Sequence, residues 1–229
     1  MAEIIEKQKH LKIAISQRVD MYEMYMEERD GLATDWQICL SDLFGREILL
    51  FPITNNPLAA QEVLEVITPD IIVLTGGNDI SGRSDAVTIS HKREDTERTL
   101  LSYSIATNCP VFAVCRGFQF LNNFAGGKVF PIKEHVAAVH DVFVENQNGN
   151  ASIFTVNSFH NFTVPANGLS KSFQIVAQDK DGNVEAARHE YLPWLGIMWH
   201  PERTNNSEAA TRWLRTAVQR LVTATEEHL

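Results

Sequence analysis

Two short and almost uninterrupted apolar runs constrain the fold of this chain most: DIIVLT at 70–75 and PVFAV at 110–114. Runs of this length without polar alternation are typical of strands covered on both faces, which occur mainly in parallel sheets. Further strand-sized runs alternate with helix-like spacing of apolar residues. We expect strands at 12–16 and 47–51 and helices at 32–43, 57–66 and 94–106, the last with Leu100, Leu101 and Ile105 buried. The alternation predicts a doubly wound parallel α/β sheet.

Beyond residue 128 the pattern changes to that of antiparallel hairpins. The expected hairpin strands are 141–145 with 152–156 around a QNGNA turn, and 173–178 with 183–188 around DKDG. One more strand at 194–199 and an amphipathic helix at 208–223 follow. We therefore expect an N-terminal extension at 1–10 and one α/β domain over 11–229, whose mostly parallel sheet carries an antiparallel extension.

Charge and cysteine content argue against several classes of protein. Twenty Lys and Arg face 29 Asp and Glu, a formal charge of −9 with no basic cluster, which disfavours binding to a nucleic-acid polymer. Three cysteines, none in a C-x-x-C pair, are too few for a disulfide framework or a cysteine zinc site. The first residues lack the apolar core of a secretory signal, and no apolar run has membrane length. We expect a cytoplasmic protein with a small-molecule ligand, and a homodimer stays open.

Cys115 is the candidate nucleophile, because it follows the second apolar run directly and precedes Arg116, Gly117 and an apolar-periodic helix. A sharp strand-to-helix turn exposes the side chain at its apex, and the helix N-terminus directs N–H groups at the same place. The positive end of the helix also favours the thiolate over the thiol. The alternative is that Cys115 fills the core, since cysteine is among the most buried residue types. Cys39 and Cys109 lack this context, and we expect them to be structural.

A thiol nucleophile needs a base and a group that orients the base. His200 and Glu202, separated by Pro201, follow the expected strand at 194–199. Proline keeps this segment extended, so both side chains can project to one side and Glu202 can fix the imidazole tautomer. Because the carboxyl ends of parallel strands meet at one crevice, His200 can reach Cys115. An H-P-E tripeptide alone is as compatible with an ordinary surface histidine. Together with the cysteine turn it predicts a Cys-His-Glu triad.

Four motifs occur in an order that resembles class I glutamine amidotransferases: LTGGND at 74–79, AVCRGFQ at 113–119, NSFH at 157–160 and GIMWHPER at 196–203. Over residues 11–203 the chain is most similar to their stand-alone branch related to γ-glutamyl-GABA hydrolase, a cysteine peptidase-like group. The resemblance implies a flavodoxin-like sheet in one glutamine amidotransferase type 1-like domain. It also implies roles for residues at matching positions. These are Cys115, His200 and Glu202 as the triad, the amides of Gly77 and Arg116 as the oxyanion hole, and Gln119 with the backbone of Ser158 and Phe159 as the holders of the glutamyl group.

The segments SQRVD at 16–20 and EERDGLATDW at 27–36 resemble proteins encoded with surface-polysaccharide genes, among them γ-glutamyl-CDP-amidate hydrolases of capsule phosphoramidate biosynthesis. This resemblance implies a γ-glutamyl hydrolase that forms a cysteine thioester and releases glutamate, without metal or organic cofactor. A nucleotide-linked amidate would be its leading substrate, and γ-glutamyl-GABA-like amides the next. Arg18 after the first strand and Arg29 at the start of the next helix could then bind phosphate, unless both are solvated surface residues. Two other functions stay open: a glutaminase subunit that supplies ammonia to a separate synthetase, and a non-catalytic binding module.

Two further groups of residues give weaker signals. His135 and His140 lie five residues apart next to Asp141, but the sequence supplies no convincing third ligand, so we expect no metal site. Arg93 and Glu97 stand at positions i and i+4 of an expected helix. This spacing predicts an ion pair on the helix face that contributes only a few tenths of a kcal/mol to stability.

Overall fold

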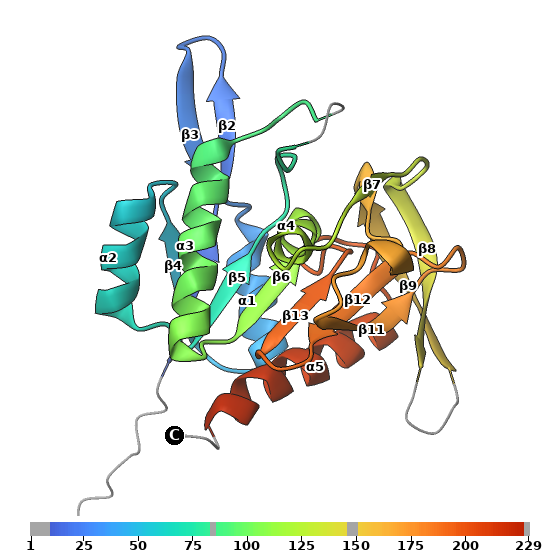
Figure 1. The fold of residues 1–229 in the computed structure, drawn as a ribbon. Helices are drawn as coiled ribbons and strands as arrows, with labels where there is room; N and C mark the ends of the chain where they lie inside the picture. Colours follow the sequence, from blue (N-terminus) through green and yellow to red (C-terminus); the bar gives the residue numbers. More distant parts are fainter. Residues whose placement is uncertain (1–9, 83–85, 146–150, 227–229) are drawn as a thin grey trace, which may run out of the picture.

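The computed structural model of the 229-residue chain describes residues 10–82, 86–145 and 151–226 (Figure 1). None of the helices in these ranges combines the length and the apolar composition that crossing a bilayer requires. The strands are β1 (Leu11–Ser16), β2 (Arg18–Tyr22), β3 (Glu27–Gly31), β4 (Ile48–Ile53), β5 (Ile71–Leu74), β6 (Val111–Val114), β7 (Phe130–Pro131), β8 (Val136–Glu145), β9 (Ala151–Phe159), β10 (Phe162–Thr163), β11 (Phe173–Gln178), β12 (Val184–His189) and β13 (Trp194–Ile197). The helices are α1 (Asp35–Phe44), α2 (Pro57–Ile67), α3 (His91–Thr107), α4 (Arg116–Phe124) and α5 (Glu208–Glu226).

One large sheet organises the described residues, with the strand order β4-β1-β5-β6-β13-β12-β11-β8-β9. The pairs from β4 to β13 are parallel, and those from β13 to β9 are antiparallel. Counted by themselves, the five parallel strands have the order 2-1-3-4-5 of flavodoxin-like folds. The expected doubly wound sheet with an antiparallel extension is therefore confirmed.

Helices cover both faces of the parallel strands (Figure 1). Apolar residues of α1 and α5 pack on one face, and those of α2, α3 and α4 pack on the other. The two strands in the middle, β5 and β6, are buried along their whole length. Burial on both faces explains why these two segments lack polar alternation in the sequence.

Three details of the fold differ from expectation. β4 continues through Pro52 to Ile53, because it is an edge strand and its outer side needs no N–H donor. β2 and β3 form a separate antiparallel hairpin between β1 and α1 that the sequence analysis did not anticipate. Ile105 is 49% exposed instead of buried. The QNGNA turn lies almost wholly outside the described residues.

The carboxyl ends of β1, β5, β6 and β13 lie at the upper edge of the sheet in Figure 1. The start of α4 lies directly against the end of β5 at this edge. A Cβ atom added at Gly117 would stand 2.3 Å from the backbone oxygen of Leu74. Only glycine permits this approach, so Gly117 sets the position of the turn between β6 and α4.

Gly117→Ala should lower the free energy of unfolding by about 1–3 kcal/mol, because the methyl group must push α4 away from β5. The matched control is Asn123→Ala, at an exposed position of the same helix, and it should change stability little. Urea unfolding followed by circular dichroism measures both variants. Equal stability of the two variants would show that the contact between α4 and β5 does not constrain the turn.

Candidate active site

Cys115 occupies the turn between β6 and α4 with φ 53° and ψ −112°, a backbone conformation that side chains other than glycine rarely adopt. Its N–H donates to the carbonyl of Ile197 in β13 at 2.8 Å, and its carbonyl accepts from the N–H of Gln119 in α4 at 3.0 Å. A strand on one side and a helix on the other thus hold this strained residue. The arrangement is a strand-to-helix nucleophile turn, and it accounts for the signal around Cys115 in the sequence.

The imidazole of His200 joins Cys115 to Glu202. Its Nδ1 atom lies 2.7 Å from Oε1 of Glu202, and both side chains are buried. The same ring makes a hydrogen bond with Cys115. Burial alone lowers the pKa of His200, but the attraction and hydrogen bond to Cys115, together with Glu202, outweigh this effect and raise the pKa to about 9. The structure therefore brings together the three residues that the sequence proposed as a triad, and it favours a protonated imidazole between them at neutral pH.

Asn157 fixes the backbone of the catalytic histidine candidate. Its Oδ1 accepts from the N–H of His200 at 2.9 Å, and its Nδ2 donates to the His200 carbonyl at 2.8 Å. Asn206 donates to the same carbonyl at 2.8 Å. The ring of Phe159 packs edge-on against the imidazole, with 5.8 Å between centroids. Sequence reasoning gave Asn157 no role, although its place at the head of the NSFH motif could have drawn attention to it.

The loop after β5, residues 75–78, lies between His200 and the guanidinium of Arg93. Arg93 donates to the carbonyls of Thr75, Gly76 and Gly77 at 2.7, 2.9 and 2.6 Å. On the other side, a Cβ atom at Gly76 would stand 2.6 Å from Cε1 of His200, so the loop approaches the imidazole as only glycine can. The described peptide bonds are all trans. The N–H of Gly77 therefore points opposite to the Gly76 carbonyl, away from Arg93.

Arg93 belongs to a buried ionic network beneath the nucleophile turn. Its Nε lies 2.9 Å from Oε1 of Glu97, and the other oxygen of Glu97 contacts the guanidinium of Arg116. Burial lowers the pKa of Arg93 to about 10, which leaves it charged at neutral pH. Burial by itself would raise the pKa of Glu97, but attraction to Arg116 and Arg93 holds it below the usual value. The network thus joins the loop after β5 to the residue that follows Cys115.

The expected helix-face ion pair between Arg93 and Glu97 is therefore wrong, since both side chains are fully buried. The physical reason lies in the helix itself. Positions 93, 97, 100, 101 and 104 recur at spacings of three and four and form one buried face of α3. The burial of Leu100 and Leu101, which the sequence analysis did expect, could have indicated that Arg93 and Glu97 share their face.

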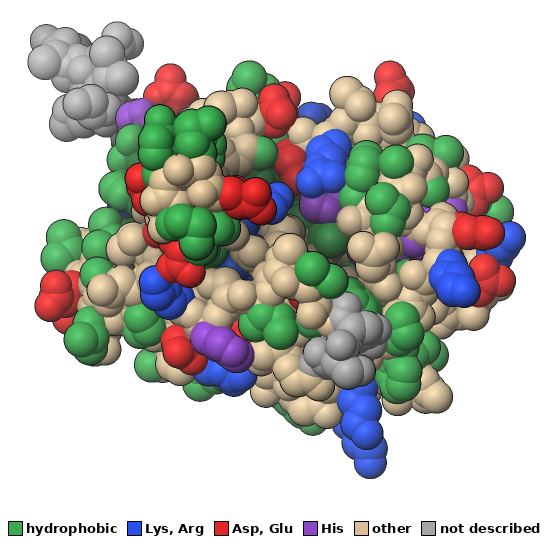
Figure 2. Space-filling model, turned by 90° about the horizontal axis from the view of Figure 1, so that it is seen from above, with side chains coloured by type: hydrophobic (Ala, Val, Ile, Leu, Met, Phe, Trp, Pro, Cys, Tyr) green, Lys and Arg blue, Asp and Glu red, His purple; other side chains and the backbone are tan. Residues whose placement is uncertain are grey.

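Seen from above, the edge that carries Cys115 is hollowed near its middle, and acidic, basic and histidine side chains border the hollow (Figure 2). The family to which the chain belongs follows from its sequence over this whole region, because a model of the peptidase C26 family matches residues 13–202. The chain belongs to the peptidase C26 family. That match contains the loop after β5, the cysteine turn and the His200–Glu202 pair.

Individual relatives agree with the membership in the peptidase C26 family. The chain is 32% identical over 195 residues to γ-glutamyl-CDP-amidate hydrolase of Campylobacter jejuni, covering 84% of this chain and 90% of that protein. It is 30% identical to γ-glutamyl-γ-aminobutyrate hydrolase of Escherichia coli O157:H7, over 59% of this chain and 63% of that protein. Family and relatives together support a hydrolase.

Solved structures show the same fold at low sequence identity. A Thermoplasma acidophilum protein assigned to GMP synthase, as one of its subunits, superposes with a TM-score of 0.68 at 20% identity, covering 96% of this chain and 97% of that one. A glutamine amidotransferase of Thermotoga maritima gives a TM-score of 0.57 at 16% identity, covering 95% and 86%. The class I glutamine amidotransferase fold implied by the motifs is therefore confirmed.

The residues expected to hold a glutamyl group lie around the turn of this peptidase C26 member. Gln119 is buried in α4, and its Nε2 donates to the carbonyl of Phe162 at 2.9 Å. Ser158 is buried at the end of β9, and its hydroxyl donates to the carbonyl of His135 at 2.7 Å. Phe159 contacts His200, as described above. α4 and the end of β9 thus approach one another beside the candidate triad.

The two arginines proposed as phosphate ligands differ in their surroundings. Arg18 lies on the loop after β5, with its Cβ and Cδ 3.3 Å from where a Cβ of Gly77 would stand, and its half-exposed guanidinium pairs with Asp20 at 2.7 Å. Arg29 is not at a helix start but in β3. Its side chain pairs with Glu27 at 2.9 Å and lies over the ring of Tyr22. Of these two arginines, Arg18 lies on the oxyanion-hole candidate.

The other two cysteines have the structural environments that the sequence indicated. Burial raises the pKa of the Cys39 and Cys109 thiols to about 12, so both are protonated at neutral pH. The thiol of Cys109 donates to the carbonyl of Pro69 at 3.4 Å. Neither residue therefore competes with Cys115 as a nucleophile.

Arg93→Lys should lower the free energy of unfolding by about 3 kcal/mol, because an ammonium group cannot serve three carbonyls and Glu97 at once. Arg98→Lys is the matched control, since Arg98 is exposed on the same helix. Thermal unfolding monitored by calorimetry compares both variants with the wild type. A similar melting temperature for Arg93→Lys and Arg98→Lys would mean that the guanidinium does not hold the loop.

Proposed function

We propose that this protein hydrolyses a γ-glutamyl amide through a thioester intermediate on Cys115 and releases glutamate. One observation carries the proposal: the buried imidazole of His200 bonds to Cys115 and to Glu202 at once. The similarity to two γ-glutamyl amide hydrolases supports the same substrate class. A non-catalytic binding module would not need a cysteine, an imidazole and a carboxylate aligned in this order.

In the first half of the reaction, the thiolate of Cys115 attacks the γ-carbonyl carbon of the substrate. The backbone N–H groups of Gly77 and Arg116 bind the oxyanion of the tetrahedral intermediate. Two features support this role: the Gly77 N–H points away from Arg93, and the Arg116 N–H lies in the first turn of α4, which lacks intrahelical acceptors. The imidazolium of His200 donates its proton to the departing nitrogen as the C–N bond breaks.

In the second half, water replaces the departed amine. His200, now neutral, accepts a proton from this water, and the hydroxide attacks the thioester carbon. The C–S bond breaks, glutamate leaves, and Cys115 and His200 return to the thiolate and imidazolium forms. Glu202 keeps the imidazole in one orientation through both halves.

We further propose that the leading substrate is a nucleotide-linked amidate such as γ-glutamyl-CDP-amidate, with γ-glutamyl-GABA-like amides next. The Campylobacter jejuni relative, which matches over most of both chains, supports this order. The surroundings of the oxyanion-hole candidate support it as well, because Arg18 places a half-exposed guanidinium beside Gly77. A guanidinium there can form two parallel hydrogen bonds to a phosphate on the leaving group.

Glutamate release from glutamine, γ-glutamyl-GABA and γ-glutamyl-CDP-amidate tests the reaction and the substrate together. The wild type and Cys39→Ala should release glutamate, and Cys115→Ala should not. Arg18→Ala should lower kcat/KM for the nucleotide amidate by about tenfold or more and leave glutamine turnover nearly unchanged. Arg29→Ala is the control for Arg18, since its side chain is paired within the hairpin.

Three outcomes would contradict these proposals. Glutamate release by Cys115→Ala would rule out the thioester, and an unchanged kcat/KM after Arg18→Ala would rule out the phosphate contact. Turnover of glutamine alone, and only with a partner protein present, would instead identify a glutaminase subunit that supplies ammonia to a synthetase.

The pH dependence of kcat/KM should fall at high pH, with an apparent pKa near the value of about 9 for His200. Above that pH the imidazole has lost the proton that the leaving nitrogen needs, whereas below it this proton is present. Glu202→Gln removes a group that raises the pKa of His200, so the alkaline limb should move to lower pH. Glu208→Gln, an exposed carboxylate on α5, is the control. An alkaline limb that Glu202→Gln leaves in place would assign it to another group.

A further inference from the structure

A second cluster of ionisable side chains lies in the antiparallel half of the sheet. His135 precedes β8, His140 lies in β8, His160 follows β9, and Glu185 lies in β12. One ligand atom each from His135, His160 and Glu185 lie within 4.8 Å of one another. His140 completes the group, with its Nε2 atom 3.3 Å from Oε1 of Glu185. The sequence offered two histidines without a third ligand, and the fold supplies both a histidine and a carboxylate.

The central members of this cluster are buried polar groups that lack partners. His160 is 4% exposed and Glu185 is fully buried. Within the described part of the chain, neither ring nitrogen of His160 nor Oε2 of Glu185 finds a hydrogen-bond partner. An unpartnered buried polar atom is costly, so such groups normally bind a water molecule or an ion. Three such atoms within one cluster point to a ligand between them.

We propose that His135, His160 and Glu185 bind a divalent transition-metal ion such as Zn²⁺, with His140 as the fourth ligand. Imidazole nitrogen and carboxylate oxygen are the donors that Zn²⁺ and its neighbours in the first transition row prefer in proteins. Ligand atoms about 2.1 Å from an ion lie at most about 4.2 Å apart. Starting from 4.8 Å, the side chains need to close by less than about 1 Å to bind the ion.

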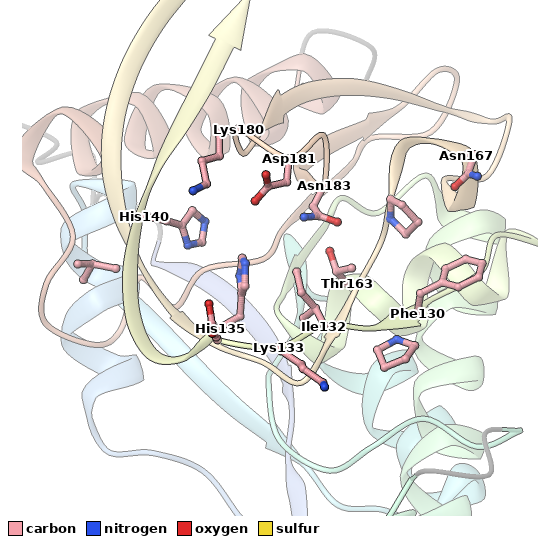
Figure 3. A pocket seen from close by; sticks show the side chains of 14 residues that line it. Phe130, Ile132, Lys133, His135, His140, Thr163, Asn167, Lys180, Asp181 and Asn183 are labelled. Atoms are coloured by element: carbon pink, nitrogen blue, oxygen red, sulfur yellow. The ribbon is translucent and has the colours of Figure 1, made fainter.

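An ion can reach this cluster from solvent. His135 and His140 line a cavity of about 700 Å³, and their side chains project into it in Figure 3. Lys133, Glu134, Lys180 and Asp181 line the same cavity, so its two acidic and two basic side chains leave no excess positive charge to repel a cation. The cavity thus provides the entry path that a protein metal site requires.

The proposed ion would join strands that are distant in sequence and hold the segment next to the catalytic histidine. It links the start of β8, the end of β9 and the middle of β12. The hydroxyl of Ser158 donates to the carbonyl of His135, and Phe159 packs on His200. The ion takes no part in the hydrolysis, and its role is to fix the end of β9. This site is independent of the substrate proposed above.

Metal titration of the full-length Cys115→Ser protein tests this proposal, because that variant cannot hold the ion through the catalytic thiolate. After treatment with a chelator, it should bind one equivalent of Zn²⁺ or Co²⁺ by isothermal titration calorimetry. The Co²⁺ form should show d–d bands without a thiolate charge-transfer band. Glu185→Gln and His160→Asn in the same background should weaken binding by at least about tenfold. His91→Gln, an exposed histidine on α3, should not.

X-ray absorption of the Zn²⁺-loaded Cys115→Ser protein gives a readout that does not depend on whether the ligand variants fold. It should show nitrogen and oxygen ligands with at least two imidazoles. Thermal unfolding should shift upward with Zn²⁺ in this protein and in His91→Gln, but not in Glu185→Gln. The proposal is overturned by the absence of stoichiometric binding, by fewer than two imidazoles, or by a Glu185→Gln protein that binds as tightly as its parent.

Discussion

The buried pair of Arg93 and Glu97 joins the two loops that form the reaction centre. Arg93 holds three carbonyls of the loop after β5, while Glu97 contacts the guanidinium of Arg116, which directly follows Cys115. Removing two charges from water is expensive, and only a complete set of hydrogen bonds offsets this cost. The loops therefore have one low-energy arrangement. A donor fixed before the substrate arrives needs no reorganisation during the reaction, which is how an oxyanion hole is most effective.

Sequence reasoning was most successful where the chain is apolar or where a motif stands at the end of a strand. The uninterrupted runs in β5 and β6 indicated a sheet covered on both faces, and the carboxyl ends of parallel strands must meet. These two facts were enough to place Cys115 and His200 at one edge. The same reasoning failed for Arg93, because a charged i, i+4 pair on a helix is usually exposed and its burial depends on tertiary contacts. It also failed for the metal-ligand candidates, since β9 and β12 bring His160 and Glu185 to His135 only through the order of strands.

The hairpin of β2 and β3 shows another limit. Its strands, RVDMY and EERDG, are mostly polar and show no alternation, so nothing in the pattern distinguishes them from a loop. The contacts that define the hairpin come from elsewhere in the chain. Asp30 accepts hydrogen bonds from the backbone and side chain of Asn55, and Val19 exchanges hydrogen bonds with the side chain of Asn78.

These contacts lie near the base of the hairpin, whereas Met24 and Met26 at its tip are 75% and 78% exposed. The base is thus tied to the reaction centre, and the tip contributes almost nothing to the core. Substitutions or length changes at the tip can accumulate without disturbing Cys115, His200 or the sheet. Homologues can therefore diverge in what they admit at the rim while they inherit the same bond-breaking apparatus unchanged.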